Sequence, residues 1–100
     1  MGGMRIVARP ILRSDWEANP DSEVSLKAWH SVVKRADWST PQELKDQIGN
    51  ASILKKGRVV FNIKGNTYRL VTSINYDYRM VYVRFIGTHK EYDQIDAEEV

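Results

Sequence analysis

The second half of the chain alternates between apolar and polar residues, and this alternation restricts the fold more than any other feature. Three segments beyond Gly57 carry it: residues 59–64, 67–74 and 80–86. Successive side chains of a β-strand point to opposite faces, so each segment is predicted to be a strand with one buried face. Gly65–Asn66 and residues 76–78 are short enough to be turns. The pattern therefore predicts a three-stranded antiparallel meander.

The first half of the chain has helical spacing instead. Residues 5–8 form a short β-branched run, ended by Pro10, that we expect to be a first strand. Pro10 suits the first turn of a helix in which Ile11, Leu12 and Trp16 fall at near-helical spacing, up to Asn19–Pro20. Asp21 or Ser22 is expected to cap a longer helix that ends near Ala36. Its apolar stripe consists of Leu26, Trp29, Val32 and Val33.

A second helix start follows at Thr40. Thr40 stands at the capping position, Pro41 at the first helical position and Glu43 three residues after the cap. We expect this short helix to stop at Gly49–Asn50 in a left-handed turn. Three tryptophans are predicted to pack in the core or between helices, namely Trp16, Trp29 and Trp38.

The order of these elements predicts the fold class. A strand, two to three helices, the meander and a short C-terminal helical turn form an α+β domain with helices on one face of the sheet. A chain of 100 residues builds one core, and Met-Gly-Gly before a second methionine reads as a remnant of an expression vector. We therefore expect a single domain over residues 4–100, with residues 1–3 as the remnant.

The absence of cysteine excludes disulfides and thiolate zinc sites. No apolar run is long enough to span a membrane, and no basic and then apolar leader is present. These observations favour a cytoplasmic protein without a membrane partner. No cofactor and no metal site are expected.

Charge is divided unevenly along the chain. The stretch from Leu54 to Lys90 holds eight basic residues and one acid, Asp77, for a net charge of +7, whereas the whole chain carries +2. Such a division within one small domain is typical of proteins that bind polyanions. The alternative is a solvated basic sheet without a partner.

Alternation also assigns side chains to faces. We expect Val59, Phe61 and Ile63 to face the helices, together with Leu70, Thr72 and Ile74 of the next strand, and Val81, Val83 and Phe85 of the last. The open face would then collect Asn62, Lys64, Arg69, Tyr82 and Arg84. Outward charges can protect a half-exposed sheet from aggregation. Cations without acids between them indicate instead a bound phosphate backbone, with Tyr82 offering a ring for an unpaired base.

His89 and Tyr92 follow the last strand three residues apart. On one helical turn they would project from the end of the sheet toward the basic face. Histidine titrates near neutrality and can transfer a proton in RNA cleavage. The alternative is a capping turn with Tyr92 packed on the sheet edge. His30, in the long helix beside Trp29, is interpreted as structural or surface-exposed.

Two blocks of sequence resemble a known family. The first, from Arg58 to Val71, includes Phe-Asn-Ile-Lys-Gly-Asn and Tyr-Arg-Leu-Val, and the second, from Val83 to Asp93, includes Gly-Thr-His-Lys-Glu-Tyr-Asp. Together they resemble the HigB-type toxins, a branch of the RelE-like toxins of type II toxin–antitoxin systems. The resemblance runs over residues 4–96 and includes the order of helices and meander.

The resemblance implies an mRNA interferase, an endoribonuclease that typically cuts mRNA in the ribosomal decoding site and inhibits translation. It also implies a HigA-type antitoxin with a helix-turn-helix domain, in a complex that can be of higher order. Arg69 matches the arginine used on the scissile phosphate, and His89 falls where superfamily members place a functional Arg or His. The catalytic candidates are His89, Arg69, Tyr92 and Lys64. The RNA-binding candidates are Asn62, Arg84, Tyr82, Lys55, Lys56, Arg58 and Lys90.

The expected mechanism needs no metal. A base deprotonates the ribose 2′-hydroxyl, which attacks the adjacent phosphorus, and an acid protonates the leaving 5′-oxygen. Arg69, with Arg84 or Lys64, would stabilise the phosphoryl charge, and His89 would transfer a proton. Two alternatives use the same basic face: a non-catalytic RNA- or ribosome-binding module, and a domain that binds an acidic protein partner.

Overall fold

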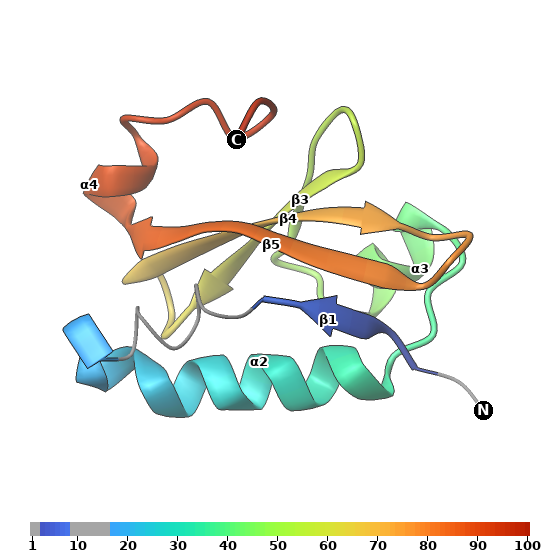
Figure 1. The fold of residues 1–100 in the computed structure, drawn as a ribbon, viewed down its shortest axis with the longest axis horizontal. Helices are drawn as coiled ribbons and strands as arrows, with labels where there is room; N and C mark the ends of the chain where they lie inside the picture. The colour runs from blue at the N-terminus through green and yellow to red at the C-terminus, as the bar shows by residue number, and fades with distance from the viewer. Residues whose placement is uncertain (1–2, 9–16) are drawn as a thin grey trace.

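The computed structural model describes residues 3–8 and 17–100. A five-stranded sheet forms the middle layer (Figure 1). The elements in chain order are β1 (Arg5–Val7), the 3-10 turn η1 (Pro20–Ser22), α2 (Glu23–Arg35), α3 (Pro41–Gln47), β2 (Ser52–Ile53), β3 (Arg58–Ile63), β4 (Tyr68–Asn75), β5 (Met80–Thr88) and α4 (His89–Tyr92). The part of the first expected helix that contains Ile11, Leu12 and Trp16 lies outside the described residues.

The predicted α+β class and the antiparallel meander are confirmed. The strands lie in the order β1-β5-β4-β3-β2, with β3, β4 and β5 antiparallel and β1 parallel to β5. Strand β2 was not predicted, because a strand of two residues shows no alternation. It pairs with β3 at one edge of the sheet. None of the helices among the described residues is long and apolar enough to cross a membrane.

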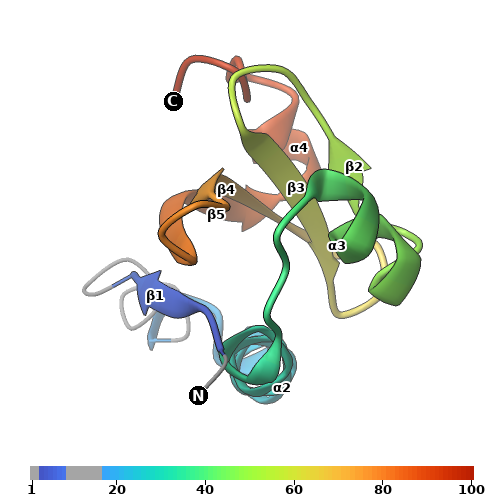
Figure 2. The same ribbon diagram turned by 90° about the vertical axis from the view of Figure 1, so that its right-hand side faces the viewer.

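The main core lies between the sheet and α2, which runs along one face in Figures 1 and 2. Phe61 of β3 meets Trp29 of α2 edge to face, with ring centroids 5.5 Å apart. Burial of such rings is a major source of folding free energy. We call this helix-covered side the first face. Its buried strand residues include Val59, Phe61, Ile63, Leu70, Ile74, Val81 and Val83, as predicted, and Trp38 is also buried there.

The sequence predicted the start of α2 and both ends of α3. The structure agrees at the start of α3 and differs at the other two ends. Thr40 accepts a hydrogen bond from the backbone N–H of Glu43, as predicted. Ser22 precedes α2 but makes no side-chain cap hydrogen bond, because its hydroxyl donates to the carbonyl of Asn19. The expected left-handed turn at Gly49–Asn50 is wrong: neither residue has a positive φ, and α3 ends at Gln47.

A β-bulge changes the facing of β5. Val71 of β4 lies opposite Phe85, whereas the next residue, Thr72, lies opposite Val83, so Arg84 is an extra residue in β5. An extra residue breaks the two-residue alternation. The prediction that Phe85 shares a face with Val81 and Val83 is therefore wrong. Phe85 packs in a separate cluster on the opposite side of the sheet, which we call the second face.

The C-terminal segment, residues 93–100, lies over this second face (Figures 1 and 2). Ala97 is buried against Val60 and Val71, and these three residues form the centre of a small second core. Leu54, Phe85, Tyr92, Ile95 and Val100 pack around it. The sheet is thus covered on both sides, by helices on the first face and in part by the chain end on the second.

Candidate functional site

Three rows of directly paired residues cross the second face. The row nearest the β3–β4 turn consists of Asn62, Arg69 and Gly87. The middle row is apolar and consists of Val60, Val71 and Phe85. The third row consists of Arg58, Ser73, Tyr82 and Val7. Opposite residues of paired strands share a face, so two polar rows lie on either side of an apolar strip.

The first row leads to His89. Thr88 closes a capping box with Glu91, which starts α4 directly at the end of β5. The backbone N–H of His89 donates to the carbonyl of Thr67 in the β3–β4 turn, at 3.3 Å. Arg69 reaches the same turn, where its Nη1 donates to the carbonyl of Asn66 at 3.2 Å. His89 and Arg69 therefore lie at the same end of the sheet.

His89 has an acidic neighbour on α4. Its Nδ1 lies 3.2 Å from Oδ2 of Asp93, and 55% of its side chain is exposed. Asn62 is half-buried, and its Nδ2 lies 3.5 Å from the carbonyl oxygen of Asn50. We call Asn62, Arg69, His89 and Asp93 the sheet-end site. It combines a guanidinium group, an amide, an imidazole and one carboxylate, all reachable from solvent.

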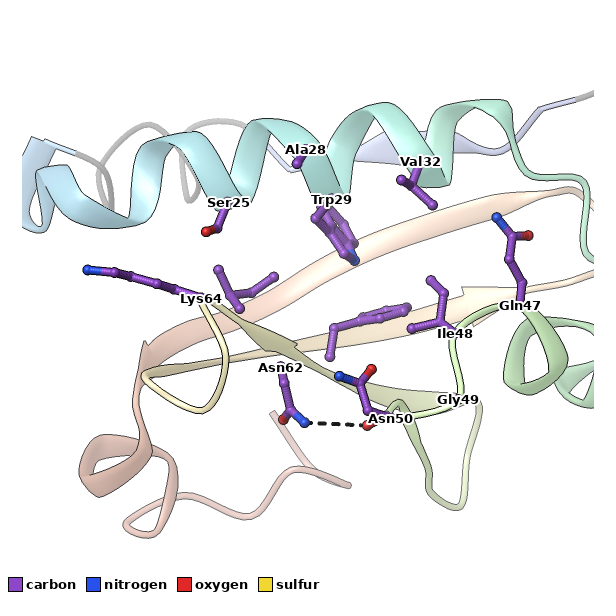
Figure 3. A pocket seen from close by; sticks show the side chains of 12 residues that line it. Ser25, Ala28, Trp29, Val32, Gln47, Ile48, Gly49, Asn50, Asn62 and Lys64 are labelled. Atoms are coloured by element: carbon purple, nitrogen blue, oxygen red, sulfur yellow. Dashed lines mark hydrogen bonds between the residues drawn. The ribbon is translucent and has the colours of Figure 1, made fainter.

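Lys64 does not join this site, which corrects its predicted place on the open face. Both Lys64 and Gly65 have a positive φ in the β3–β4 turn, and this conformation turns the lysine toward the first face. Its Nζ binds Oδ2 of Asp21 at 2.7 Å. Figure 3 shows Lys64 extended beside α2, whereas Asn62 points away from that helix. The hydrogen bonds from Lys64 and Tyr68 lower the pKa of Asp21 below its usual value.

The third row is separate from the sheet-end site, so the expected convergence of Arg84 and Tyr82 with Arg69 and His89 is wrong. Ser73 lies four positions beyond Arg69 on β4, which corresponds to about 13 Å along a strand. Arg84 instead lies over the ring of Tyr82, with its guanidinium carbon 5.4 Å from the ring centroid. The bulge places Arg84 there.

Three predicted RNA contacts face the C-terminal segment. The backbone N–H of Lys55 lies 3.4 Å from a carboxylate oxygen of Glu98, and Lys56 pairs with Glu99. The contact with Glu99 raises the pKa of Lys56. Arg58 donates from Nη2 to the carbonyl of Val100 at 2.7 Å. The acidic chain end thus occupies part of the basic surface that the sequence indicated.

Tyr92 and Lys90 lie on α4 with different surroundings. Tyr92 is partly buried against the second core, which agrees with the alternative that it packs on the sheet. Lys90 is exposed. Tyr92 therefore joins α4 to the sheet, next to the sheet-end site.

Sequence reasoning missed two contributions to these sites. One is Asp93, whose spacing of four residues from His89 on a helical turn is the signal that could have found it. The other is the set of acids near the chain end, whose charge complements the basic stretch from Leu54 to Lys90. Its members Glu98 and Glu99 contact that stretch.

A groove on the first face has a different chemistry. It lies between α2, β3 and the chain after α3, with a volume of about 490 Å³ (Figure 3). Trp29, Val32, Ile48 and Phe61 make much of its lining apolar. Within the described ranges, no three His, Asp or Glu side chains gather as a metal site would require.

The fold and the sheet-end site define a class: a small α+β protein with a cationic sheet face and a histidine at the end of its last long strand. Residues 22–95 match the family model of the HigB toxins, described as the RelE-like toxic component of a toxin–antitoxin system. The chain belongs to this family. As a toxic component it has an antitoxin as partner.

Relatives carry names consistent with this family. The chain is 27% identical over 94 residues to the mRNA interferase HigB of Escherichia coli O6:H1, an alignment that covers 92% of the chain and 91% of the relative. It is 29% identical over 97 residues to the mRNA interferase toxin HigB of Escherichia coli K12, with 94% and 92% covered. The mRNA interferase HigB of Shigella flexneri matches to the same extent.

Proposed function

We propose that this chain is an mRNA interferase: an endoribonuclease that cuts single-stranded mRNA at the sheet-end site and thereby inhibits translation. The observation that carries the proposal is the placement of Arg69 and His89 at one end of the sheet, both bonded to the β3–β4 turn. A phosphate-binding group and a proton-transfer group are the two elements that metal-independent RNA cleavage requires.

Arg69 binds the scissile phosphate in this proposal. One of its nitrogens is held by the carbonyl of Asn66, which fixes the guanidinium group while other N–H groups stay available. A guanidinium fork gives two parallel hydrogen bonds to phosphate oxygens. It therefore stabilises the negative charge that grows when the 2′-oxygen attacks phosphorus. Asn62, directly opposite Arg69 on β3, offers an amide beside the same phosphate.

His89 transfers the proton. The Asp93 carboxylate beside Nδ1 favours a proton on that nitrogen, so Nε2 stays available to the RNA. Nε2 of His89 takes the proton of the 2′-hydroxyl, the 2′-oxygen forms a bond to phosphorus, and the bond to the 5′-oxygen breaks as water donates a proton to that oxygen. The products are a 2′,3′-cyclic phosphate and a 5′-hydroxyl end.

The remaining candidates take supporting roles. Tyr92 packs against the second core and holds α4, and with it His89, in place. Exposed cations such as Lys90 attract the RNA backbone without fixing its position. Lys64, bound to Asp21 on the first face, stabilises the β3–β4 turn from which the site is built.

Partners and location follow from the same proposal. The antitoxin is a HigA-type protein with a helix-turn-helix domain, and the two form a higher-order complex. The substrate is mRNA positioned in the ribosome, and the site of action is the cytoplasm. Support comes from the match to the HigB toxin family and from the names of the relatives.

The test is His89→Gln, with His30→Gln as the matched control. His30 lies on α2, on the other side of the sheet. We expect His89→Gln to abolish growth arrest and new 5′-hydroxyl ends, measured by primer extension on RNA from expressing cells, while His30→Gln retains both. A folded His89→Gln protein with full cleavage would overturn the role of His89. RNA binding without any new ends from the unaltered chain would favour the non-catalytic binding module.

A further inference from the structure

A second hollow lies at the opposite end of the sheet, beside the β4–β5 turn. It has a volume of about 520 Å³, and most of its lining residues are polar. They are Ser39, Ser73, Ile74, Asn75, Tyr76, Asp77, Tyr82 and Arg84. Two of them, Ser73 and Tyr82, belong to the third row of the second face. The hollow therefore continues onto the sheet surface that carries the sheet-end site.

The centre of this surface is a stacked pair. Arg84 is exposed and lies over the ring of Tyr82, 5.4 Å from its centroid. Val7 lies directly opposite Tyr82 on β1, with 44% of its surface exposed, and extends the platform to the sheet edge. Unpaired bases stack on aromatic rings and on guanidinium planes. A layered arginine and tyrosine pair offers both in one place.

The charge around the pair favours a phosphate. Arg58, at the far end of the row, bonds to Ser73 and to the carbonyl of Val100, and its buried Nε has no hydrogen-bond partner in the described part of the chain. Arg58 is thus held by the C-terminal segment and is not part of the lining of the hollow. Among the residues that line the hollow, Asp77 is the single acid, on the β4–β5 turn. The guanidinium group of Arg84 therefore faces a hollow whose lining carries little negative charge.

We propose that the Tyr82–Arg84 pair, with Ser73, forms a nucleotide subsite that binds one base and its adjoining phosphate, apart from the cleavage centre. This inference rests on the proposed function and deepens it, because it assigns a second contact to the same single-stranded mRNA. The base stacks on the pair, and Arg84 attracts the phosphate. One strand advances about 3.4 Å per stacked nucleotide, so the roughly 13 Å to Arg69 corresponds to about four nucleotides.

The experiment measures binding of a short single-stranded 2′-deoxy oligonucleotide to the full chain by NMR titration. This probe lacks the 2′-hydroxyl, so it binds without being cleaved. Arg84→Gln and Tyr82→Leu are compared with Arg35→Gln, which removes the same charge from an exposed position in the last turn of α2. We expect shifts at residues 73 and 82–84 in the unaltered chain, and about tenfold weaker binding in both subsite variants. Arg35→Gln should bind normally.

Cleavage assays on ribosome-bound mRNA separate this proposal from the nuclease proposal. Arg84→Gln should raise KM about tenfold and leave kcat nearly unchanged, because the subsite binds RNA without touching the reacting atoms. Cleavage by the unaltered chain, with equal probe affinity in all three variants, overturns the subsite and leaves the nuclease intact. Probe binding at the pair without any cleavage overturns the nuclease and leaves the subsite. The absence of shifts at residues 73 and 82–84 overturns the subsite.

Discussion

At the scale of single residues, the shape of the Arg69 side chain matters as much as its charge. Arg69→Lys keeps the charge but loses the fork that fits phosphate. We expect the cleavage rate to fall about 10²-fold, a typical loss for one positioned donor. Single-turnover cleavage of ribosome-bound mRNA measures it, and Arg35→Lys on α2 is the control. Full activity in Arg69→Lys would show that charge alone suffices.

Phe61 is the residue on which the main core depends most clearly. It is 1% exposed and packs edge to face on Trp29. Phe61→Ala should lower the free energy of unfolding by about 3–5 kcal/mol, from lost burial and the cavity left behind. Tyr78→Ala, at a position 77% exposed, should change it by less than about 0.5 kcal/mol. Urea unfolding of both variants measures the difference, and similar losses would contradict this description of the core.

At the scale of elements, α4 depends on Gly87. A Cβ at this position would lie 2.8 Å from Oε1 of Glu91 and 2.8 Å from Cζ of Phe85. Gly87→Ala should therefore push Glu91 out of the capping box and displace His89. We expect cleavage to fall more than tenfold while most of the stability remains, since cap losses are about 1 kcal/mol.

Gly49→Ala is the matched control for this prediction. Nothing lies within 4 Å of a Cβ there, and the residue has no positive φ. Both variants are assayed for cleavage and for urea midpoint. Equal cleavage by Gly87→Ala and Gly49→Ala would mean that the capping box does not position His89.

Asp21 connects the turn η1 to the β3–β4 hairpin through Lys64 and Tyr68. Because these bonds lower the pKa of Asp21 below 3.8, its contribution to stability is present above that pH and is lost as the pH falls through the lower, folded value. Asp21→Asn should be less stable than the unaltered chain at neutral pH, and the difference should shrink in acid.

Urea midpoints at neutral pH and below pH 3.8 test this prediction. Asp46→Asn is the control, because that carboxylate accepts from the neutral amide of Gln42 and not from a cation. A difference between Asp21→Asn and the unaltered chain that stays constant with pH would exclude the contribution of the Asp21 charge.

Elements that follow from local patterns were predictable, and those set by distant contacts were not. Alternation identified β3, β4 and β5 because each buries one face against α2. It failed at Phe85, because the bulge residue Arg84 carries no mark in the sequence. Lys64 was misplaced because its positive φ is unusual for lysine. Arg69 and His89 were expected together, and the register of β4 and β5 brings them there.

At the scale of the whole molecule, the distribution of ion pairs lowers the charge available to RNA. Three of the eight basic residues between Leu54 and Lys90 pair with carboxylates: Lys56 with Glu99, Lys64 with Asp21 and Arg79 with Asp37. Five have no Asp or Glu side chain as an ion-pair partner within residues 3–8 and 17–100. The basic surface is therefore smaller than the sequence alone indicates.

The salt dependence of RNA binding measures how many of the basic residues contact phosphate. Each phosphate contact with a single strand contributes about −0.7 to the slope of log K against log salt, so five contacts give about −3.5 and eight about −5.6. We expect the smaller magnitude for the unaltered chain with the uncleavable probe. Glu99→Gln releases Lys56 and should steepen the slope by about 0.7. An unaltered slope near −5.6 would show that the paired lysines also bind RNA.

The bulge in β5 has a consequence for the architecture of related toxins. Because Arg84 is an extra residue, each later side chain of β5 lies on the opposite face of the sheet from the one it would occupy in a regular strand of the same sequence. A homologue that kept this residue but paired it regularly, without a bulge, would turn the side chain of Phe85 toward α2 and launch its final helix with the opposite rotation. Two toxins with the same histidine and equally long strands, one with the bulge and one without it, would then present the histidine to opposite sides of the molecule.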